Sequence, residues 1–364
     1  MDFFYSFPVV RGTQAGSTFF TAMVPLRMLN SLFGSAEECV PPEYRAQRRL
    51  NGSRIPEIRN YILENRNTYV FSALAASVDG EMEFEPSGSR DLGVLQVSMD
   101  AKFLINDGQH RIAAILEAVQ EDESLLKESI PVVLFEDKGL NRSQQMFTDL
   151  NKHAVRTSNS IAELYDCRDA LAVLTRETIK EIPFLNEFTD KERDILGKNS
   201  PALFTLNMFY KANKRIVGRS ELDNDLSSFV ALFWKTVTKY MIPWQDLRKR
   251  ELSKRDVKEK SISAQAVFIQ SLGKLACSLK QYSPEELDVA LSKLADVSWN
   301  RSDKAWFMRT IGPTGRVLNS DKAISLTASK IKCELGIPLS GDEEQKESEY
   351  IKEIEGQVKD GFAK

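Results

Sequence analysis

Cysteine, histidine and long apolar runs are all scarce in this sequence of 364 residues, and each shortage excludes a class of protein. The four cysteines lie far apart with no CxxC pair, and only two histidines are present, so neither a metal site nor a disulfide framework is expected. No segment approaches the ~20 apolar residues that span a bilayer, and the N-terminus lacks a basic, apolar leader. We therefore expect a cytoplasmic protein without membrane contact.

Net charge is also small. The 49 Lys and Arg residues face 52 Asp and Glu residues, so contact with nucleic acid would need a local basic patch. Walker A sequences, GxGxxG loops and an arguable Ser-His-Asp set are missing as well. What the sequence does have is a hydrophobic fraction of 42%, ample for packed cores, and a length that favours two domains.

The first 155 residues alternate between strand-like and helix-like segments. A hairpin is predicted around "TQAG", between the β-rich segments "FFYSFPVVRG" and "STFFTAMVPL". Apolar spacing predicts helices over residues 42–65 and from 109 to about 120. Further strands are expected at "VFSALAASVDG", "VLQVSM", "KFLIN" and "IPVVLFED". The segment therefore predicts a mixed α+β domain over residues 1–155.

From residue 156 to 340 the apolar period is helical almost throughout, which predicts an α-helical second domain. Ser283 followed by Pro284 and Glu286 is typical of a helix start. Residues 341–364 are highly charged, so we expect either a solvated terminal helix or a frayed tail.

The sequence "FLINDGQHRIAAI", residues 103–115, carries the clearest candidate site. A strand end that feeds a helix start presents free amides and the positive end of the helix dipole, which attract anions. Gly108 leaves the backbone open to close approach, and His110 and Arg111 add donors for phosphate. Asp107 suits a metal ion, the orientation of Arg111, or a helix cap. The alternative interpretation is simply an Asp-capped helix after a tight turn.

Two basic segments are candidates for contact with DNA. Residues 42–65 contain five arginines, and residues 247–260 contain seven cations against three acids, a net charge of +4. A charged, solvated helix face or connection is the alternative for both. The candidate DNA-binding residues are Arg48, Arg49, Arg248, Lys249, Arg250, Lys254 and Arg255.

Two further segments invite a nucleic-acid interpretation but favour a structural one. "ISAQAVFIQSLGKLACSLK" has Gly273 in mid-pattern, as in a helix-turn-helix, yet its apolar positions favour a core helix. In the stretch from Trp299 to Arg316, aromatic residues alternate with arginines. Such a combination is able to stack on nucleic-acid bases, but more often it forms a loop with cation–π packing.

Several motifs together resemble a known family. "DGQHR" between a strand and an apolar helix resembles the DGQHR-domain proteins of the ParB/sulfiredoxin-like group. "VVRGTQAGSTFFTAMVPLRML", "RRLNGSRIPEIRNYI" and "QQMFTDLNKHAVRTSNSI" resemble that family's other segments, in order. The whole chain resembles the DndB family of the bacterial DNA sulfur-modification system, which replaces a non-bridging phosphate oxygen of DNA by sulfur.

The resemblance implies an accessory, regulatory protein that binds DNA near the promoter of the modification operon and restrains transcription or modification. It also implies partners: operon DNA, with or without phosphorothioate, and other sulfur-modification proteins. Because operator sites are usually symmetric, a homodimer is expected.

The ParB/sulfiredoxin-like resemblance further implies a bound nucleotide, ATP or another NTP with Mg²⁺. The implied phosphate-binding residues are Gly108, Gln109, His110, Arg111 and Asn151. Gln109 stands where sulfiredoxins carry a reactive cysteine, which excludes their sulfinic-acid repair. Asp107 is then the one candidate catalytic base in the motif. The alternatives are an NTPase or DNA-nicking enzyme in phosphorothioate-linked defence, and a scaffold in which the motif only caps a helix.

Overall fold

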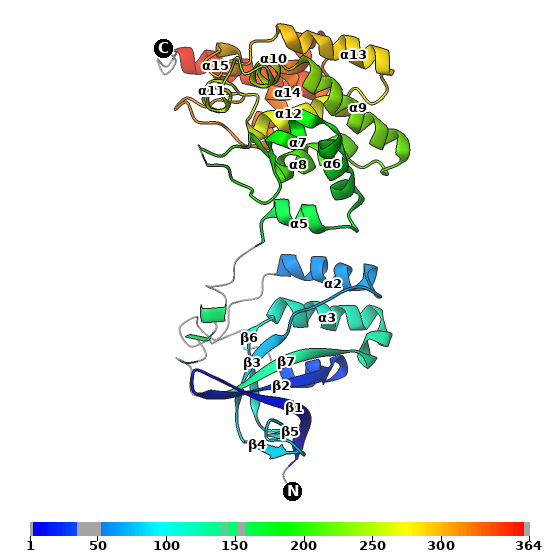
Figure 1. The fold of residues 1–364 in the computed structure, drawn as a ribbon, viewed down its shortest axis with the longest axis vertical. Helices are drawn as coiled ribbons and strands as arrows, with labels where there is room; N and C mark the ends of the chain where they lie inside the picture. Colours follow the sequence, from blue (N-terminus) through cyan, green and yellow to red (C-terminus); the bar gives the residue numbers. More distant parts are fainter. Residues whose placement is uncertain are drawn as a thin grey trace. The chain divides into compact units, whose positions relative to one another are not determined.

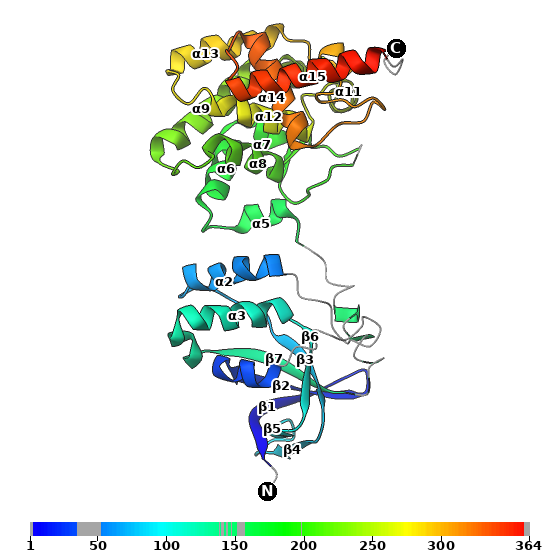
Figure 2. The ribbon, with the colours of Figure 1, turned by 180° about the vertical axis from the view of Figure 1, so that it is seen from behind.

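The chain divides into two compact units, residues 1–155 and 156–364, in the computed structural model (Figures 1 and 2). The structure describes residues 3–34, 52–137, 139, 142, 145–146, 148–150, 157–197 and 199–359. A seven-stranded sheet forms the first unit and helices form most of the second, which confirms the mixed α+β class.

The predicted hairpin opens the first unit. β1 (Phe4–Gln14) and β2 (Ser17–Pro25) pair antiparallel, with Gln14 opposite Ser17. Ala15 and Gly16 between them have φ values of +50° and +74°. Positive φ at both turn residues gives the tight hairpin loop whose twist matches that of the strands.

The sheet continues on both sides of this hairpin in the order β4-β5-β1-β2-β7-β3-β6. All neighbours pair antiparallel except β3 and β7, which run parallel. β4 was not expected from the sequence. The remaining strands are β3 (Leu74–Asp79), β4 (Met82–Pro86), β5 (Leu92–Ser98), β6 (Lys102–Asp107) and β7 (Ser129–Glu136).

Helix α3 (Gln109–Glu121) covers one face of the sheet, and α2 (Ile55–Glu64) packs on α3 (Figure 1). Ile112, Ile115 and Ala118 of α3 join the buried side chains of the strands in a single core. The helix predicted from residue 109 is thus confirmed. The one predicted over residues 42–65 is described only from residue 52, and its earlier part lies outside the described residues. The unit also contains α1 (Leu29–Phe33), η1 (Leu26–Met28), η3 (Gly52–Arg54) and η4 (Glu123–Lys127).

The second unit is helical, as the apolar period predicted, apart from a short parallel pair of strands, β8 (Thr189–Asp190) and β9 (Phe204–Thr205). The predicted helix start at Ser283 is confirmed, because Ser283 and Glu286 form a reciprocal capping box. The helices are α5 (Asn159–Tyr165), α6 (Ala170–Glu181), α7 (Pro183–Phe188), α8 (Leu206–Val217), α9 (Asn224–Tyr240), α10 (Ile242–Arg248), α11 (Lys254–Lys260), α12 (Ala266–Cys277), α13 (Pro284–Ser292), η5 (Lys293–Asp296), η6 (Lys304–Trp306), α14 (Asp321–Leu335) and α15 (Gly341–Lys359).

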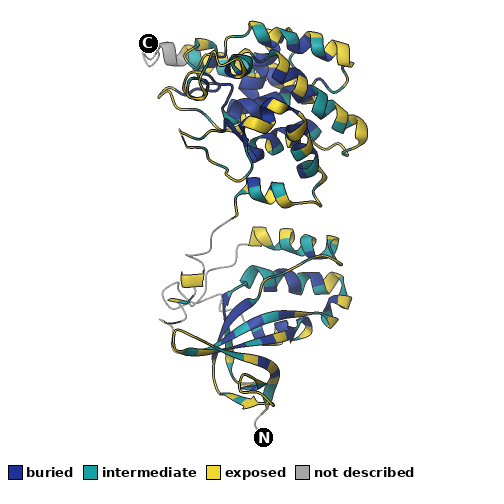
Figure 3. Ribbon diagram, viewed as in Figure 1, coloured by how far each residue is buried: buried dark blue, intermediate teal, exposed yellow. Residues whose placement is uncertain are grey.

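Buried residues gather inside the helices of the second unit (Figure 3). All four tryptophans of the chain belong to this core. Trp299 and Trp306 stack on each other with ring centroids 5.5 Å apart. They therefore serve the core and are unavailable to nucleic-acid bases, as the structural interpretation of the stretch from Trp299 predicted.

Helix α12 is likewise a core helix. It crosses α8 so closely that a Cβ at Gly273 would lie 2.3 Å from the carbonyl oxygen of Ala212. Only glycine permits this approach of the two backbones. The glycine that resembled a helix-turn-helix element is therefore explained by packing.

Residues 341–359 of the charged C-terminal segment form α15, which is anchored by ion pairs to buried cations. Lys332 of α14, 5% exposed, binds Glu343 at 2.7 Å, and Arg309 pairs with Glu347 through two hydrogen bonds. Tyr350 also donates to the Phe307 carbonyl oxygen at 2.9 Å. Breaking such an ion pair would leave a buried cation unpaired, so α15 is a structural part of the unit.

No helix among the residues that the structure describes combines the length and the apolar character needed to cross a bilayer.

Glu163 of α5 is a buried carboxyl group without a cationic hydrogen-bond partner. Asn207 donates to its Oε1, and its Oε2 has no hydrogen-bond partner among the described residues. Burial, with the nearby charges of Asp194 and Asp169, raises the pKa of Glu163 to about 7. Between pH 4.5 and about pH 7, Glu163 is therefore protonated in the folded unit but largely ionised in the unfolded chain, where its pKa is 4.5.

This difference predicts a pH-dependent stability. A raised folded-state pKa means that stability falls as the pH rises from about 4.5 to about 7, so the second unit should be more stable at pH 5.5 than at pH 8. We expect a difference of about 1–3 kcal/mol in the free energy of unfolding, and Glu163→Gln should largely remove it. Tryptophan fluorescence during denaturation reports on this unit alone, because the unit contains every tryptophan of the chain. The unit contains neither histidine, so histidine titration does not contribute to the pH dependence. An unchanged pH dependence in Glu163→Gln would contradict the assignment.

Candidate functional site

The DGQHR residues occupy the corner where β6 turns into α3. Asp107 ends the strand, Gln109 begins the helix, and Gly108 between them has a φ of +106°. A Cβ on Gly108 would lie 2.3 Å from the Cδ2 atom of Leu74. The positive φ favours glycine, and a Cβ here would also force the Leu74 side chain to move. Gly108 therefore has a structural role in addition to the predicted approach of a ligand.

The first turn of α3 has neither a side-chain cap nor an acidic residue. The N-cap residue of α3 is Gly108 rather than Asp107, and the Asp107 carboxylate accepts a hydrogen bond from Arg111. Gln109 and His110 lie half-buried in this turn. An N-terminus without a capping side chain retains the partial positive charge that binds anions.

Arg111 binds the protein itself in this structure. Its Nη2 donates to the Asp107 carboxylate at 2.7 Å, and its Nη1 donates to the carbonyl oxygen of Ser72 at 2.6 Å and to the Ser72 hydroxyl at 2.9 Å. The guanidinium thus ties the chain before β3 to the start of α3. A phosphate that bound Nη2 of Arg111 would compete with Asp107 for this donor.

Three of the predicted site residues are not described. Asn151, which the family resemblance adds to the phosphate site, lies outside the described residues, as do Arg48 and Arg49 of the first basic segment. Arg59, from the same segment, is on α2 and forms an ion pair with Glu121 of α3 at 3.2 Å.

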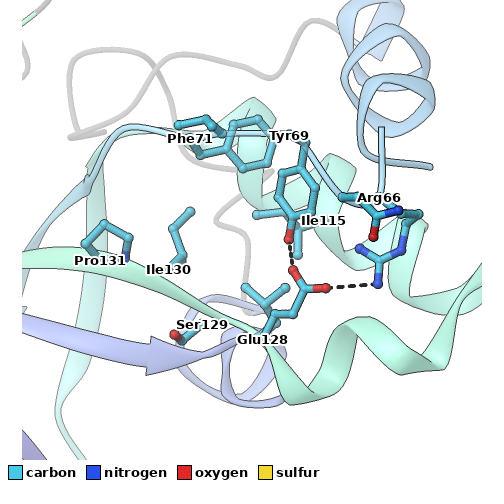
Figure 4. Close-up of a pocket in the computed structure, with 11 residues that line it drawn as sticks. Arg66, Tyr69, Phe71, Ile115, Glu128, Ser129, Ile130 and Pro131 are labelled. Carbon is cyan, nitrogen blue, oxygen red and sulfur yellow. Dashed lines mark hydrogen bonds and ion pairs between the residues drawn. The ribbon is translucent and has the colours of Figure 1, made fainter. Parts of the chain in front are cut away.

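A cavity of about 370 Å³ lies beside α3, and sequence reasoning missed it. Ile115, one turn after Arg111, forms part of its wall (Figure 4). The other lining residues come from three separate segments, so no local sequence pattern predicts that they lie together. They are Leu26, Arg66, Asn67, Tyr69, Val70, Phe71, Glu128, Ser129, Ile130 and Pro131.

Glu128 organises the polar end of this cavity. It accepts hydrogen bonds from the Tyr69 hydroxyl and from Nη2 of Arg66, the latter at 2.9 Å (Figure 4). Arg66 also binds Asp122 at 2.7 Å. Burial, followed by the hydrogen bond to Glu128, raises the pKa of Tyr69 to about 12, so the phenol keeps its proton and donates.

The second basic segment spans the end of α10, a turn and α11. Arg248, Lys249 and Arg250 are all exposed at this turn, and Arg250 has a φ of +66°. None of the ion pairs among the described residues involves these three. The turn therefore presents three exposed cations that form no ion pair within the described part of the protein.

Most cations of α11, unlike those of the turn, bind other groups of the protein. Arg255 pairs with Glu259 at 3.2 Å, Lys260 pairs with Asp256 at 2.7 Å, and Lys258 donates to the Ser200 carbonyl oxygen. Lys254 is exposed and lies over the ring of Phe188 at 5.2 Å. Of the five predicted DNA-binding residues in this segment, only Arg255 has an acidic partner among the described residues. The other four are Arg248, Lys249, Arg250 and Lys254.

A family model for DndB, described as DNA-sulfur modification-associated, matches residues 7–338. The chain belongs to the DndB family. The match includes most of both units and shows involvement in DNA sulfur modification. No curated protein and no solved structure gives a significant match to the chain, so the ParB/sulfiredoxin-like expectation for the first unit stays a prediction. Among the described residues, no group of three His, Cys, Asp or Glu side chains is arranged to hold a metal ion.

The contacts of Arg111 predict a local effect of its removal. Arg111→Ala should open the segment before β3, because hydrogen bonds from a charged donor each contribute about 1.5–3 kcal/mol. We expect amide hydrogen exchange over residues 69–74 to become at least roughly tenfold faster. Arg59→Ala, which removes a more exposed arginine of the same unit, should leave that segment nearly unchanged. Equal exchange in both variants would contradict the role assigned to Arg111.

Proposed function

We propose that this DndB-family chain is a DNA-binding regulator that binds DNA near the promoter of the modification operon and restrains its transcription. The family match supports the connection to DNA sulfur modification. The exposed cations at the α10–α11 turn support the contact with DNA. Other sulfur-modification proteins and a second copy of the chain are proposed partners, the latter because a symmetric operator suits a dimer.

The single observation that carries the DNA contact is the absence of acidic partners for Arg248, Lys249 and Arg250 among the described residues. Some exposed cations of the same unit, such as Lys239 and Lys322, are paired with carboxylates, whereas the turn gathers three consecutive cations that are not paired among the described residues. Unpaired, exposed cations release condensed counterions when they meet phosphate, which is the main source of affinity for a DNA backbone. A short turn suits backbone contact better than base readout in a groove.

Neutralising this turn should reduce both DNA affinity and its salt dependence. The triple variant Arg248→Gln, Lys249→Gln and Arg250→Gln should lower the slope of log affinity against log salt by about 2–3, since each phosphate contact contributes about 0.9. Fluorescence anisotropy with a DNA duplex over a series of salt concentrations measures this slope.

The matched control removes the same charge from paired cations. A triple Lys→Gln variant at Lys239, Lys322 and Lys330 lowers the net charge equally, but each lysine has a carboxylate partner in the protein. Its salt slope should stay close to that of the unaltered protein. Equal slopes in the two triple variants would refute the assignment of the turn.

We also propose that the start of α3 binds the phosphates of a nucleotide, ATP or another NTP with Mg²⁺. The N-terminus without a capping side chain supports this site, with Gly108, Gln109, His110 and Arg111 around it and Asn151 as the implied fifth member. In this proposal Arg111 exchanges the Asp107 carboxylate for phosphate. Loss of that ion pair would also free Asp107, the candidate base of the alternative function, an NTPase or DNA-nicking enzyme.

Calorimetric titration with Mg²⁺–ATP and other NTPs tests the phosphate site. We expect binding that is at least roughly tenfold weaker in Arg111→Ala, because a charge-assisted contact to phosphate is lost. No heat of binding with any NTP would leave the corner as a structural junction only. Nucleotide turnover or strand nicking that DNA stimulates, and that Asp107→Asn abolishes, would favour the enzyme over the regulator.

A further inference from the structure

The lining of the cavity beside α3 combines apolar side chains with polar groups. Tyr69 and Phe71 contribute aromatic rings with centroids 5.6 Å apart, and Ile115, Ile130 and Pro131 line the same space (Figure 4). The exposed residues Asn67, Val70 and Ser129 belong to its lining as well, so the cavity opens to solvent. A volume of about 370 Å³ is in the range of small-molecule sites and exceeds what a single amine or guanidinium group would fill.

The charges at the polar end determine which ligand charge the cavity favours. One cation, Arg66, is shared between two carboxylates, Asp122 and Glu128, so this end carries an excess negative charge. An anionic group such as phosphate would be repelled here, in contrast to the start of α3. The cavity therefore suits a neutral ligand, or a neutral part of a larger one.

Glu128 supplies the specific contact. Each of its oxygens accepts one hydrogen bond, from Tyr69 or from Arg66, and an ionised carboxylate has about four acceptor positions. Its side chain is 36% exposed and lines the cavity. Acceptor positions thus remain for a ligand that brings N–H donors to this end of an aromatic-walled space.

We infer that this cavity binds a nucleobase. A base is neutral and flat, its faces stack on aromatic side chains, and its edge carries the N–H donors that a carboxylate accepts, as Glu accepts from N4 of cytosine. The base has two sources, a free nucleoside or an unstacked base of DNA. The inference requires neither the DNA contact at the α10–α11 turn nor the phosphate site at the start of α3.

Calorimetric titration with the free nucleosides adenosine, cytidine, guanosine and thymidine tests the first source. We expect at least one to bind with a Kd on the order of 0.1–1 mM, the range for a ligand of this size. Binding should be roughly tenfold weaker in Phe71→Leu, which removes a stacking surface, and in Glu128→Gln, which replaces the carboxylate. Phe135→Leu and Glu123→Gln make the same changes at residues outside the cavity lining and should bind normally.

A change in the ligand gives a test that does not depend on the folding of any variant. Nucleosides methylated on the nitrogens of the pairing edge, such as N4,N4-dimethylcytidine, keep the flat ring but lack the N–H donors. They should bind at least tenfold more weakly than the parent nucleosides. Equal binding of both would overturn the role of Glu128 and with it the inference.

The second source is tested with single-stranded oligonucleotides of equal length, with bases and with abasic sites. If DNA supplies the base, the oligonucleotide with bases should bind more tightly, and Phe71→Leu should remove the difference. The triple variant of the α10–α11 turn should keep this difference even where its overall DNA affinity falls. The inference is overturned if no nucleoside binds and abasic DNA binds as tightly as DNA with bases.

Discussion

The left-handed glycine between β6 and α3 is the constraint on which the first unit depends. Gly108 turns the chain from strand to helix within one residue while its Cα packs against Leu74. This tight turn lets Arg111, in the first turn of α3, reach Ser72. Ser72 directly follows Phe71, a wall residue of the cavity, so the DGQHR corner and the cavity are joined through one segment of chain. Substitutions at the corner should therefore alter the cavity as well.

Charge is arranged differently inside and outside the second unit. Its buried cations, Lys332 and Arg309, each have a carboxylate from α15, because an unpaired buried charge would be strongly destabilising. The exposed cations at the α10–α11 turn have no such partner among the described residues. Water solvates them at little cost, and their clustering is the basis of the proposed contact with a phosphate backbone.

Local signals in the sequence predicted local structure well, but they did not predict features that depend on residues far apart in the chain. The hairpin around Ala15 and Gly16, the helix from Gln109 and the capping box at Ser283 all depend on neighbouring residues and were confirmed. β4 escaped because it is short and contains Glu and Pro, which are uncommon in strands, although Met82 and Phe84 alternate with glutamates. The bond from Arg111 to Ser72 spans 39 residues, and the cavity combines segments more than 100 residues apart, so only the folded chain brings them together.

Recognition of the modification operon's own DNA is the central proposal for this DndB-family chain. Gel-shift measurement with the DNA upstream of the operon, unmodified and sulfur-modified, tests it most directly. The proposal predicts saturable binding to the upstream fragment that is tighter than binding to an unrelated fragment of equal length. Equal affinity for the two fragments, or no binding to either at moderate salt, would contradict it.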